Sequence, residues 1–201
     1  GHLSDDIEQI VLDEGNGTPE RLWYRLADSR VAVSSTSLNR KSFQTVLDRR
    51  STWKNLDNDE ITAAIYLDDA LYLGSTQGAA RYLVQTHHWD EAQNLPHPHV
   101  NQLVLFEDEL WIATKAGIGV YDKTTLRPVE EKMLTATPDI VELKVYSKNL
   151  AHAVTDRQSL YIYDGRWSVE LMGGQGLTGL TLDKVKTVLA VEDKQWLFIG
   201  T

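Results

Sequence analysis

A repeated apolar segment is the feature of this sequence that most limits its fold. Five short segments of similar character begin at Val31, Leu71, Leu110, Leu150 and Leu197, so successive starts lie 40, 39, 40 and 47 residues apart. A repeat of this length is one supersecondary unit, which must stack on neighbouring units to bury its apolar face. The chain is therefore expected to fold as an array of units of about 40 residues.

Within a unit, the pattern is typical of β-strands. Ile61–Leu67 is an alternating stretch, followed by the polar pair Asp68-Asp69 and by the apolar segment Leu71–Ser75, which predicts a strand, a tight turn and a second strand. The second strand is almost entirely apolar and should be buried on both faces, whereas a polar fourth strand such as 166–172 should lie at an outer edge. The alternation by two, rich in Val, Ile, Tyr and Trp, disfavours a helical solenoid. Four-stranded units of this length are typical of an all-β propeller.

A family resemblance rests on the same residues. The stretch 94–125 contains Leu95-Pro96, Leu110-Trp-Ile-Ala-Thr114 and Gly117-Ile-Gly-Val-Tyr-Asp122, and it resembles the two-component-regulator propeller repeat. That repeat reads as a Gly-Leu-Pro loop, a strand, an acidic turn, Leu-Trp-Ile-Gly-Thr and a strand that starts at Gly and ends in Tyr-Asp. Stretches 57–82 and 176–201 look like further copies. The resemblance implies a propeller of four-stranded antiparallel blades in a periplasmic or extracellular sensory or interaction domain of a signalling protein.

The spacing divides the chain into four full repeats and a half repeat, all within a single β-propeller domain or propeller fragment over 1–201. The expected units are about 21–57, 58–97, 98–137, 138–180 and 181–201. Two interpretations of the half repeat stay open. The strand-like segment 6–13 supplies its outer strand and closes a ring of five blades, or the chain is a fragment of a larger propeller, whose open edge would allow self-association.

Composition excludes several classes of function. The 201 residues carry a formal net charge of −9, which disfavours nucleic acid as a partner. There is no cysteine, so disulfides, cysteine–zinc sites and thiol catalysis are excluded. No apolar run reaches the length of a membrane-spanning helix. The sequence also has no Gly-x-Ser-x-Gly elbow, and we predict no catalytic residue.

Two polar motifs are interpreted as structural. His87, His88, Asp90, His97 and His99 match no zinc-ligand spacing, so no metal site is predicted. The acidic runs at 68–69, 107–109 and 192–193 fall at the same turn of each repeat and are expected to be exposed turn residues.

The glycine pattern of 174–179 matches a dinucleotide fingerprint, but it stands before a predicted strand instead of a helix, so no cofactor is predicted. His152, in the middle of a predicted inner strand, is expected to be a hydrogen-bonded core or channel histidine.

The turn after the second strand and the loop after the fourth strand should share one face of a blade. Functional residues concentrate on loops held by a rigid scaffold, so this face is the candidate binding surface. Its ligand-binding candidates are Gln77, His97, His99, Lys115, Arg157 and Gln175. Lys115 and Arg157 are basic groups on an acidic chain, suited to a carboxylate or a sugar acid.

The sequence therefore favours a non-catalytic module that binds a small molecule, a carbohydrate or a protein partner. Two alternatives stay open. One is an enzyme on a propeller scaffold, such as a carbohydrate lyase or a glycosidase, which needs acid–base groups that converge near the axis. The other is a structural module for protein assembly.

Overall fold

The structure is a computed structural model, and it describes residues 7–12, 21–26, 31–35, 43–47, 61–83, 85–157, 159–171, 187–191 and 196–200. Its side chains are described within 61–169. Contacts divide the chain into two compact units, one of residues 1–92 and 98–103 and the other of residues 93–97 and 104–201.

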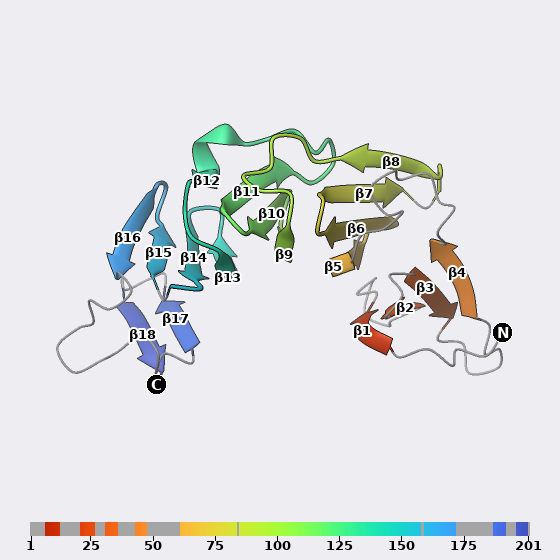
Figure 1. Cartoon of the computed structure of the whole chain (residues 1–201), viewed down its shortest axis with the longest axis horizontal. Helices are drawn as coiled ribbons and strands as arrows, with labels where there is room; N and C mark the ends of the chain where they lie inside the picture. The colour runs from red at the N-terminus through yellow and green to blue at the C-terminus, as the bar shows by residue number, and fades with distance from the viewer. Residues whose placement is uncertain are drawn as a thin grey trace. The chain divides into compact units, whose positions relative to one another are not determined.

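The described part of the chain is built almost wholly from antiparallel strands (Figure 1). Four sheets have four strands each. Their strands, in sheet order, are β1 (Ile7–Leu12), β2 (Arg21–Leu26), β3 (Val31–Ser35) and β4 (Phe43–Leu47); β5 (Ile61–Leu67), β6 (Ala70–Ser75), β7 (Ala79–Leu83) and β8 (His88–Glu91); β12 (Leu134–Thr135), β11 (Gly117–Asp122), β10 (Glu109–Thr114) and β9 (Val100–Phe106); and β13 (Ile140–Ser147), β14 (Leu150–Thr155), β15 (Leu160–Tyr163) and β16 (Trp167–Leu171). A two-stranded sheet pairs β17 (Thr187–Val191) with β18 (Trp196–Gly200).

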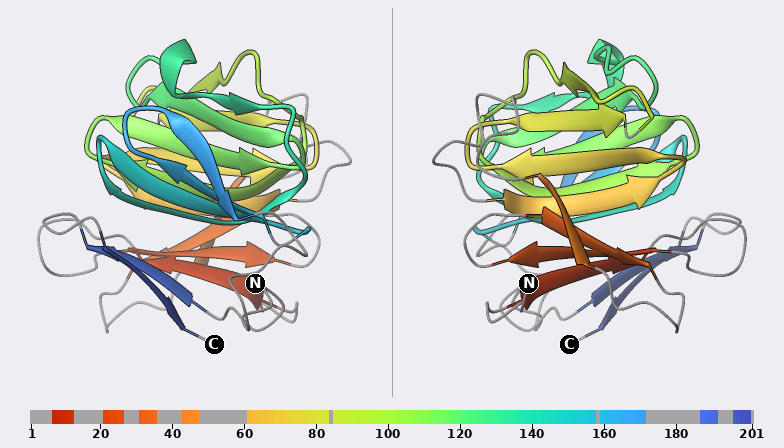
Figure 2. Two further views of the ribbon diagram at one scale, coloured as in Figure 1. Left: turned by 90° about the vertical axis from the view of Figure 1, so that its left-hand side faces the viewer. Right: turned by 90° about the vertical axis from the view of Figure 1, so that its right-hand side faces the viewer.

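Each four-stranded sheet is a simple meander, with strands that run alternately in opposite directions (Figure 2). The second strand is almost wholly buried in the sheets of β6 and β10, as its apolar sequence predicts. All six residues of β6 are buried, as are five of the six in β10. The fourth strand β8 has no buried residue. Strands with two buried faces read as continuous apolar runs, whereas edge strands tolerate polar residues, and this gradient confirms the expected order of strands within a unit.

The hairpin turns follow from local residue chemistry. Asp68 and Asp69, the two residues between β5 and β6, have φ of 52° and 58°, the backbone of a two-residue hairpin turn, for which Asp is well suited. Gly117 opens β11 where β12 approaches closely. A side chain there would come within 2.0 Å of the Leu134 carbonyl oxygen, so only glycine allows β12 to pair at this point.

The first sheet corrects two expectations. Val31–Ser35 is β3, the third strand of its sheet, and not a second strand like Leu71–Ser75. The N-terminal strand β1 lies in this sheet, paired with β2 from Ile7↔Leu26 to Leu12↔Leu22, so the first sheet spans 7–47 instead of starting at 21. Sequential strands usually pair with each other because a short connection makes closure easy, and β1 and β2 form such a pair.

The second unit holds an apolar core between two sheets. Trp111, Val120 and Leu143 are fully buried within it, together with Ile118, Ala113, Ile140, Ala151, Ala153 and Tyr163. Side chains from β10 and β11 meet those of β13, β14 and β15, and the partly buried Trp167 of β16 packs against them. This core joins the two sheets and fixes where their turns lie. Within the described residues no helix has the length and apolar character needed to cross a membrane.

Candidate functional site

The turn that follows the second strand is built in a similar way in three sheets. Each second strand ends in a buried hydroxyl residue: Ser75 in β6, Thr114 in β10 and Thr155 in β14. The Thr114 hydroxyl donates to the Gly117 carbonyl oxygen at 2.8 Å and accepts from the Ala116 amide at 3.3 Å. Ser75 makes the corresponding pair of bonds with Gly78 and Gln77. Buried hydroxyls that bridge backbone groups in this way hold a turn in one conformation.

The third turn is longer and is held by the same kind of residue. The Ser159 amide donates to the Thr155 hydroxyl at 3.0 Å, and the Thr155 amide donates to the Ser159 carbonyl oxygen, also at 3.0 Å. The three turns carry Gln77, Lys115 and Arg157, all of which are exposed. Three of the residues that the sequence singles out thus lie at matching places, each on a turn whose base is anchored in the core.

Lys115 and Arg157 share one further property. Among the described residues, neither side chain has a hydrogen bond or an ion pair with another group. Both turns belong to the second unit, one on each of its two packed sheets. The structure shows no bond between the two side chains. They are two solvated cations presented by rigid turns, which is a chemistry suited to binding an anion.

The remaining candidates lie elsewhere. His97 and His99 lie in the segment between β8 and β9 and are half-buried. Gln175, with the glycine pattern around it, lies outside the described residues. A binding role for these three residues stays a prediction from their place in the repeat.

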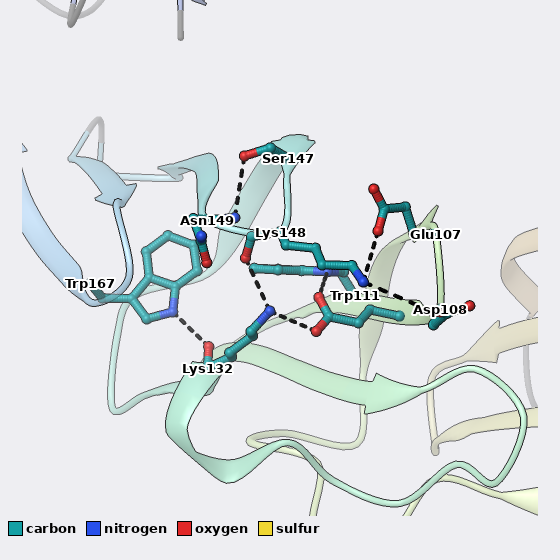
Figure 3. A network of polar contacts seen from close by, with 9 residues as sticks. Glu107, Asp108, Trp111, Lys132, Ser147, Lys148, Asn149 and Trp167 are labelled. Carbon is teal, nitrogen blue, oxygen red and sulfur yellow. Dashed lines mark hydrogen bonds and ion pairs between the residues drawn. The ribbon is translucent and has the colours of Figure 1, made fainter.

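The other end of the same two sheets is also charged, but its charges are paired. Glu107 and Asp108 form the turn between β9 and β10, and Lys148 lies in the turn between β13 and β14. The Lys148 ammonium is 2.9 Å from the Glu107 carboxylate and 3.9 Å from that of Asp108 (Figure 3). The hydrogen bond to Glu107 raises the pKa of Lys148. The acidic turn of one sheet thus meets a basic residue in the matching turn of the next sheet.

Behind this pair lies a second, less exposed cluster. The Lys132 ammonium is 2.6 Å from the Glu109 carboxylate, and their side chains are only 13% and 14% exposed. Lys132 is the last residue of the 3₁₀ turn η3 (Glu130–Lys132). The indole of Trp167 donates to the Lys132 carbonyl oxygen at 2.8 Å, as Figure 3 shows. The sequence does not predict this cluster. It predicts Glu109 to be an exposed turn residue and gives no signal for Lys132.

The place of Glu109 in its strand indicates that its carboxylate points toward the core. Glu109 is the first residue of β10, two residues before the buried Trp111 and on the same side of the strand. Its carboxylate accepts a hydrogen bond from the Trp111 indole at 3.1 Å. A carboxylate that follows the acidic turn and precedes a core tryptophan by two is thus directed inward, whereas Glu107 and Asp108 stay exposed.

His152, His87 and His88 contact neighbouring side chains. His152 is buried and its Nδ1 is hydrogen-bonded to the Tyr146 hydroxyl at 2.9 Å. Burial lowers the pKa of His152, and the Glu142 carboxylate, 3.8 Å from Nε2, partly opposes that shift. His87 is bonded to the Tyr82 hydroxyl at 2.6 Å, and His88 lies 3.3 Å from Asp90. Within the described residues no group of three or more His, Asp or Glu is arranged to hold a metal ion.

Two comparisons with known proteins give no match. No family model matches the chain, and no curated protein matches it.

Solved structures match it in fold. The extracellular domain of a putative one-component system from B. thetaiotaomicron has a TM-score of 0.64 and 21% identity, over 98% of this chain and 26% of that one. PorZ, a bacterial surface component of the type-IX secretion system of Porphyromonas gingivalis, has a TM-score of 0.65 and 12% identity, over 92% of this chain and 24% of that one. The Swd1 β-propeller domain of Myceliophteria thermophila has a TM-score of 0.66 and 16% identity, over 87% of this chain and 61% of that one.

These likenesses show the fold of the chain. It has an all-β, propeller-like fold made of antiparallel four-stranded sheets, as the repeat predicts. The chain spans about a quarter of the two bacterial structures it matches. Propellers have many unrelated functions, so what this chain binds must be argued from its own residues.

Proposed function

We propose that this protein is a non-catalytic binding module of an extracytoplasmic sensor protein, and that it binds an anionic ligand at the turns that follow the second strands. One observation carries the proposal: Lys115 and Arg157 are exposed on turns braced by buried hydroxyls, and within the described residues no carboxylate neutralises them. On a chain with a net charge of −9, acidic groups are abundant, so two cations at matching places that have no partner among the described residues favour a ligand role.

The chemistry of the two residues indicates the class of ligand. A guanidinium binds a carboxylate through two parallel hydrogen bonds, and an ammonium adds a point charge. A uronic-acid oligosaccharide offers repeated carboxylates on a polar chain, and His97 and Gln175, which belong to the same unit as Lys115 and Arg157, have the donors and acceptors to bind its hydroxyls. We propose an acidic carbohydrate of this kind as the ligand. The likeness in fold to an extracellular domain supports a place outside the cytoplasm.

Binding to galacturonic acid oligosaccharides, measured by isothermal titration calorimetry, tests the proposal. The methyl-esterified oligosaccharides have the same chain without the charge. We expect the acidic form to bind and the ester to bind at least about tenfold more weakly, since hydrogen bonds to charged groups are the strong ones. Equal affinities for the two forms would contradict an anion site.

A matched pair of double variants locates the site. Lys115→Ala with Arg157→Ala removes the two proposed contacts, and Arg127→Ala with Arg166→Ala removes the same charge from two other exposed positions. The first pair should weaken binding at least about tenfold and the second less than about twofold. An equal loss in both would show a general charge effect instead of a site. Release of new reducing ends from the oligosaccharide would favour the enzyme alternative.

A further inference from the structure

The Lys132 ammonium lies in a site that other residues build. It is 2.6 Å from the Glu109 carboxylate and 3.0 Å from the Lys148 carbonyl oxygen. It also lies 5.9 Å from the centre of the Trp111 ring and 6.0 Å from that of the Tyr163 ring. The ammonium therefore has two oxygen acceptors and two aromatic faces around it, and both kinds of contact favour a cation.

Three of the groups around the ammonium also contact one another. Trp111 is fully buried and Tyr163 is 3% exposed, and their rings meet edge to face with centroids 5.7 Å apart. The Trp111 indole donates to the second oxygen of the Glu109 carboxylate at 3.1 Å, which holds that carboxylate in place. These contacts between residues of β10 and β15 favour an arrangement that is ready to accept a cation.

The segment that supplies the ammonium is attached differently. Lys132 ends η3, in which no residue is buried. The backbone of Lys132 is held by the Trp167 indole, which donates to its carbonyl oxygen (Figure 3). Glu109, Trp111 and Tyr163 thus lie on strands and Lys148 lies in a turn, while the ammonium that they surround comes from a separate 3₁₀ turn.

We propose that Glu109, Trp111, Tyr163 and the Lys148 carbonyl form a binding site for a primary alkylammonium ion, which Lys132 occupies in this chain. The acceptors set the ligand class, because a primary ammonium donates three hydrogen bonds and can use the carboxylate and the carbonyl together. A quaternary ammonium donates none, although it is attracted to aromatic faces. The site selects a primary amine over a quaternary one, and it is separate from the anion site proposed above.

Removal of the internal occupant tests this site. In the full chain with Lys132→Ala, n-propylammonium has the length of the atoms removed. Its binding is followed by tryptophan fluorescence and by the midpoint of thermal unfolding. We expect a saturable response to n-propylammonium in this variant, at least about tenfold weaker responses to tetramethylammonium and to sodium at equal ionic strength, and none in the unsubstituted chain. The response should be lost when Glu109→Gln is added.

Two results of that titration would overturn the proposal. One is a folded Lys132→Ala variant that responds to n-propylammonium no more than to sodium. The other is a response that persists unchanged with Glu109→Gln. Circular dichroism establishes whether each variant is folded.

The unsubstituted chain gives a second test, which does not depend on the fold of any Lys132 variant. Acetylation of each lysine, followed by mass spectrometry, reports how accessible its amine is. Lys132 should react at least about tenfold more slowly than the exposed Lys115, because its ammonium is held by the Glu109 carboxylate. Equal rates for Lys132 and Lys115 would contradict the assignment.

Discussion

The two ends of the paired sheets in the second unit carry charge in opposite ways. At the end with the turns between first and second strands, Glu107 and Glu109 are paired with Lys148 and Lys132. At the end with the turns after the second strands, Arg157 and its counterpart Lys115 have no partner among the described residues. Charges that neutralise each other serve the fold, whereas charges left in water on braced turns are available to a ligand.

The two ends therefore have different roles, one in stability and the other in binding. The paired end joins neighbouring sheets, because the matching turns of the two sheets have opposite charge. At the end with the turns after the second strands, which we call the open end, Lys115 and Arg157 form no ion pair with a described residue, and each turn is braced by a hydroxyl from its own sheet. Substitutions at the first end should therefore lower stability, and substitutions at the second end should change binding.

The largest expected effect is at the aromatic centre of the paired end. Trp111→Ala removes a fully buried ring that packs against Tyr163 and Trp167. We expect a loss of about 3–5 kcal/mol in the free energy of unfolding, the usual cost of a large cavity in a core. Urea unfolding followed by circular dichroism measures it. A loss below about 1 kcal/mol would show that this cluster does not hold the two sheets together.

The next largest effect compares two acidic residues of that end. Glu109→Ala leaves the nearly buried Lys132 ammonium without its carboxylate, at a cost of about 2 kcal/mol. Glu107→Ala, the matched control, removes an exposed partner of Lys148 and should cost less than about 0.5 kcal/mol. Urea midpoints distinguish the two variants. Equal losses would mean that burial does not separate their roles.

A smaller effect is expected when a hydroxyl that holds one of the turns at the open end is removed. Thr114→Val keeps the shape of a buried residue and removes the hydroxyl that bonds Gly117 and Ala116. The expected loss is about 1 kcal/mol, that of a buried hydrogen-bonding group. Hydrogen exchange should show faster exchange of the Ala116 amide with no change in the core strands. An unchanged rate at Ala116 would contradict a bracing role.

The smallest effect is a pH dependence at His152. Burial holds the pKa of His152 below its ordinary value of 6.5, although Glu142 raises it and Lys144 lowers it further. The unfolded chain then binds a proton that the folded chain does not, so stability should fall as pH drops below about 6.5. His152→Gln should reduce that fall, and the difference between the two unfolding curves isolates this residue from the other histidines. Parallel curves from pH 7.5 to 5.5 would contradict the shift.

Sequence alone predicts the strands that are defined by burial. Leu71–Ser75, Leu110–Thr114 and Leu150–Val154 all fall in second strands, because a strand buried on both faces must be apolar throughout. Val31–Ser35 has the same character and yet is a third strand. Neighbouring inner strands are both apolar, so spacing alone does not tell a second strand from a third.

The candidate site is predictable where a single strand and turn carry it, and not where distant segments of one unit meet. The positions of Gln77, Lys115 and Arg157 on turns follow from the strand pattern of a unit. Lys132 and Glu109 belong to one unit but are 23 residues apart, and their contact depends on how η3 packs against the start of β10. Strand periodicity holds no information on such a contact, so the sequence predicts Glu109 to be exposed with the rest of its turn.

The most direct test measures affinity and stability together in two variants. One is Lys115→Ala with Arg157→Ala, and the other is Glu109→Ala, each studied by titration with galacturonic acid oligosaccharides and by urea unfolding. We predict that the first variant loses at least about tenfold in affinity with no change in its urea unfolding midpoint. The second variant should keep its affinity while its unfolding midpoint falls. Affinity retained in the first variant, or lost equally in both, would contradict the division between a paired end and a binding end.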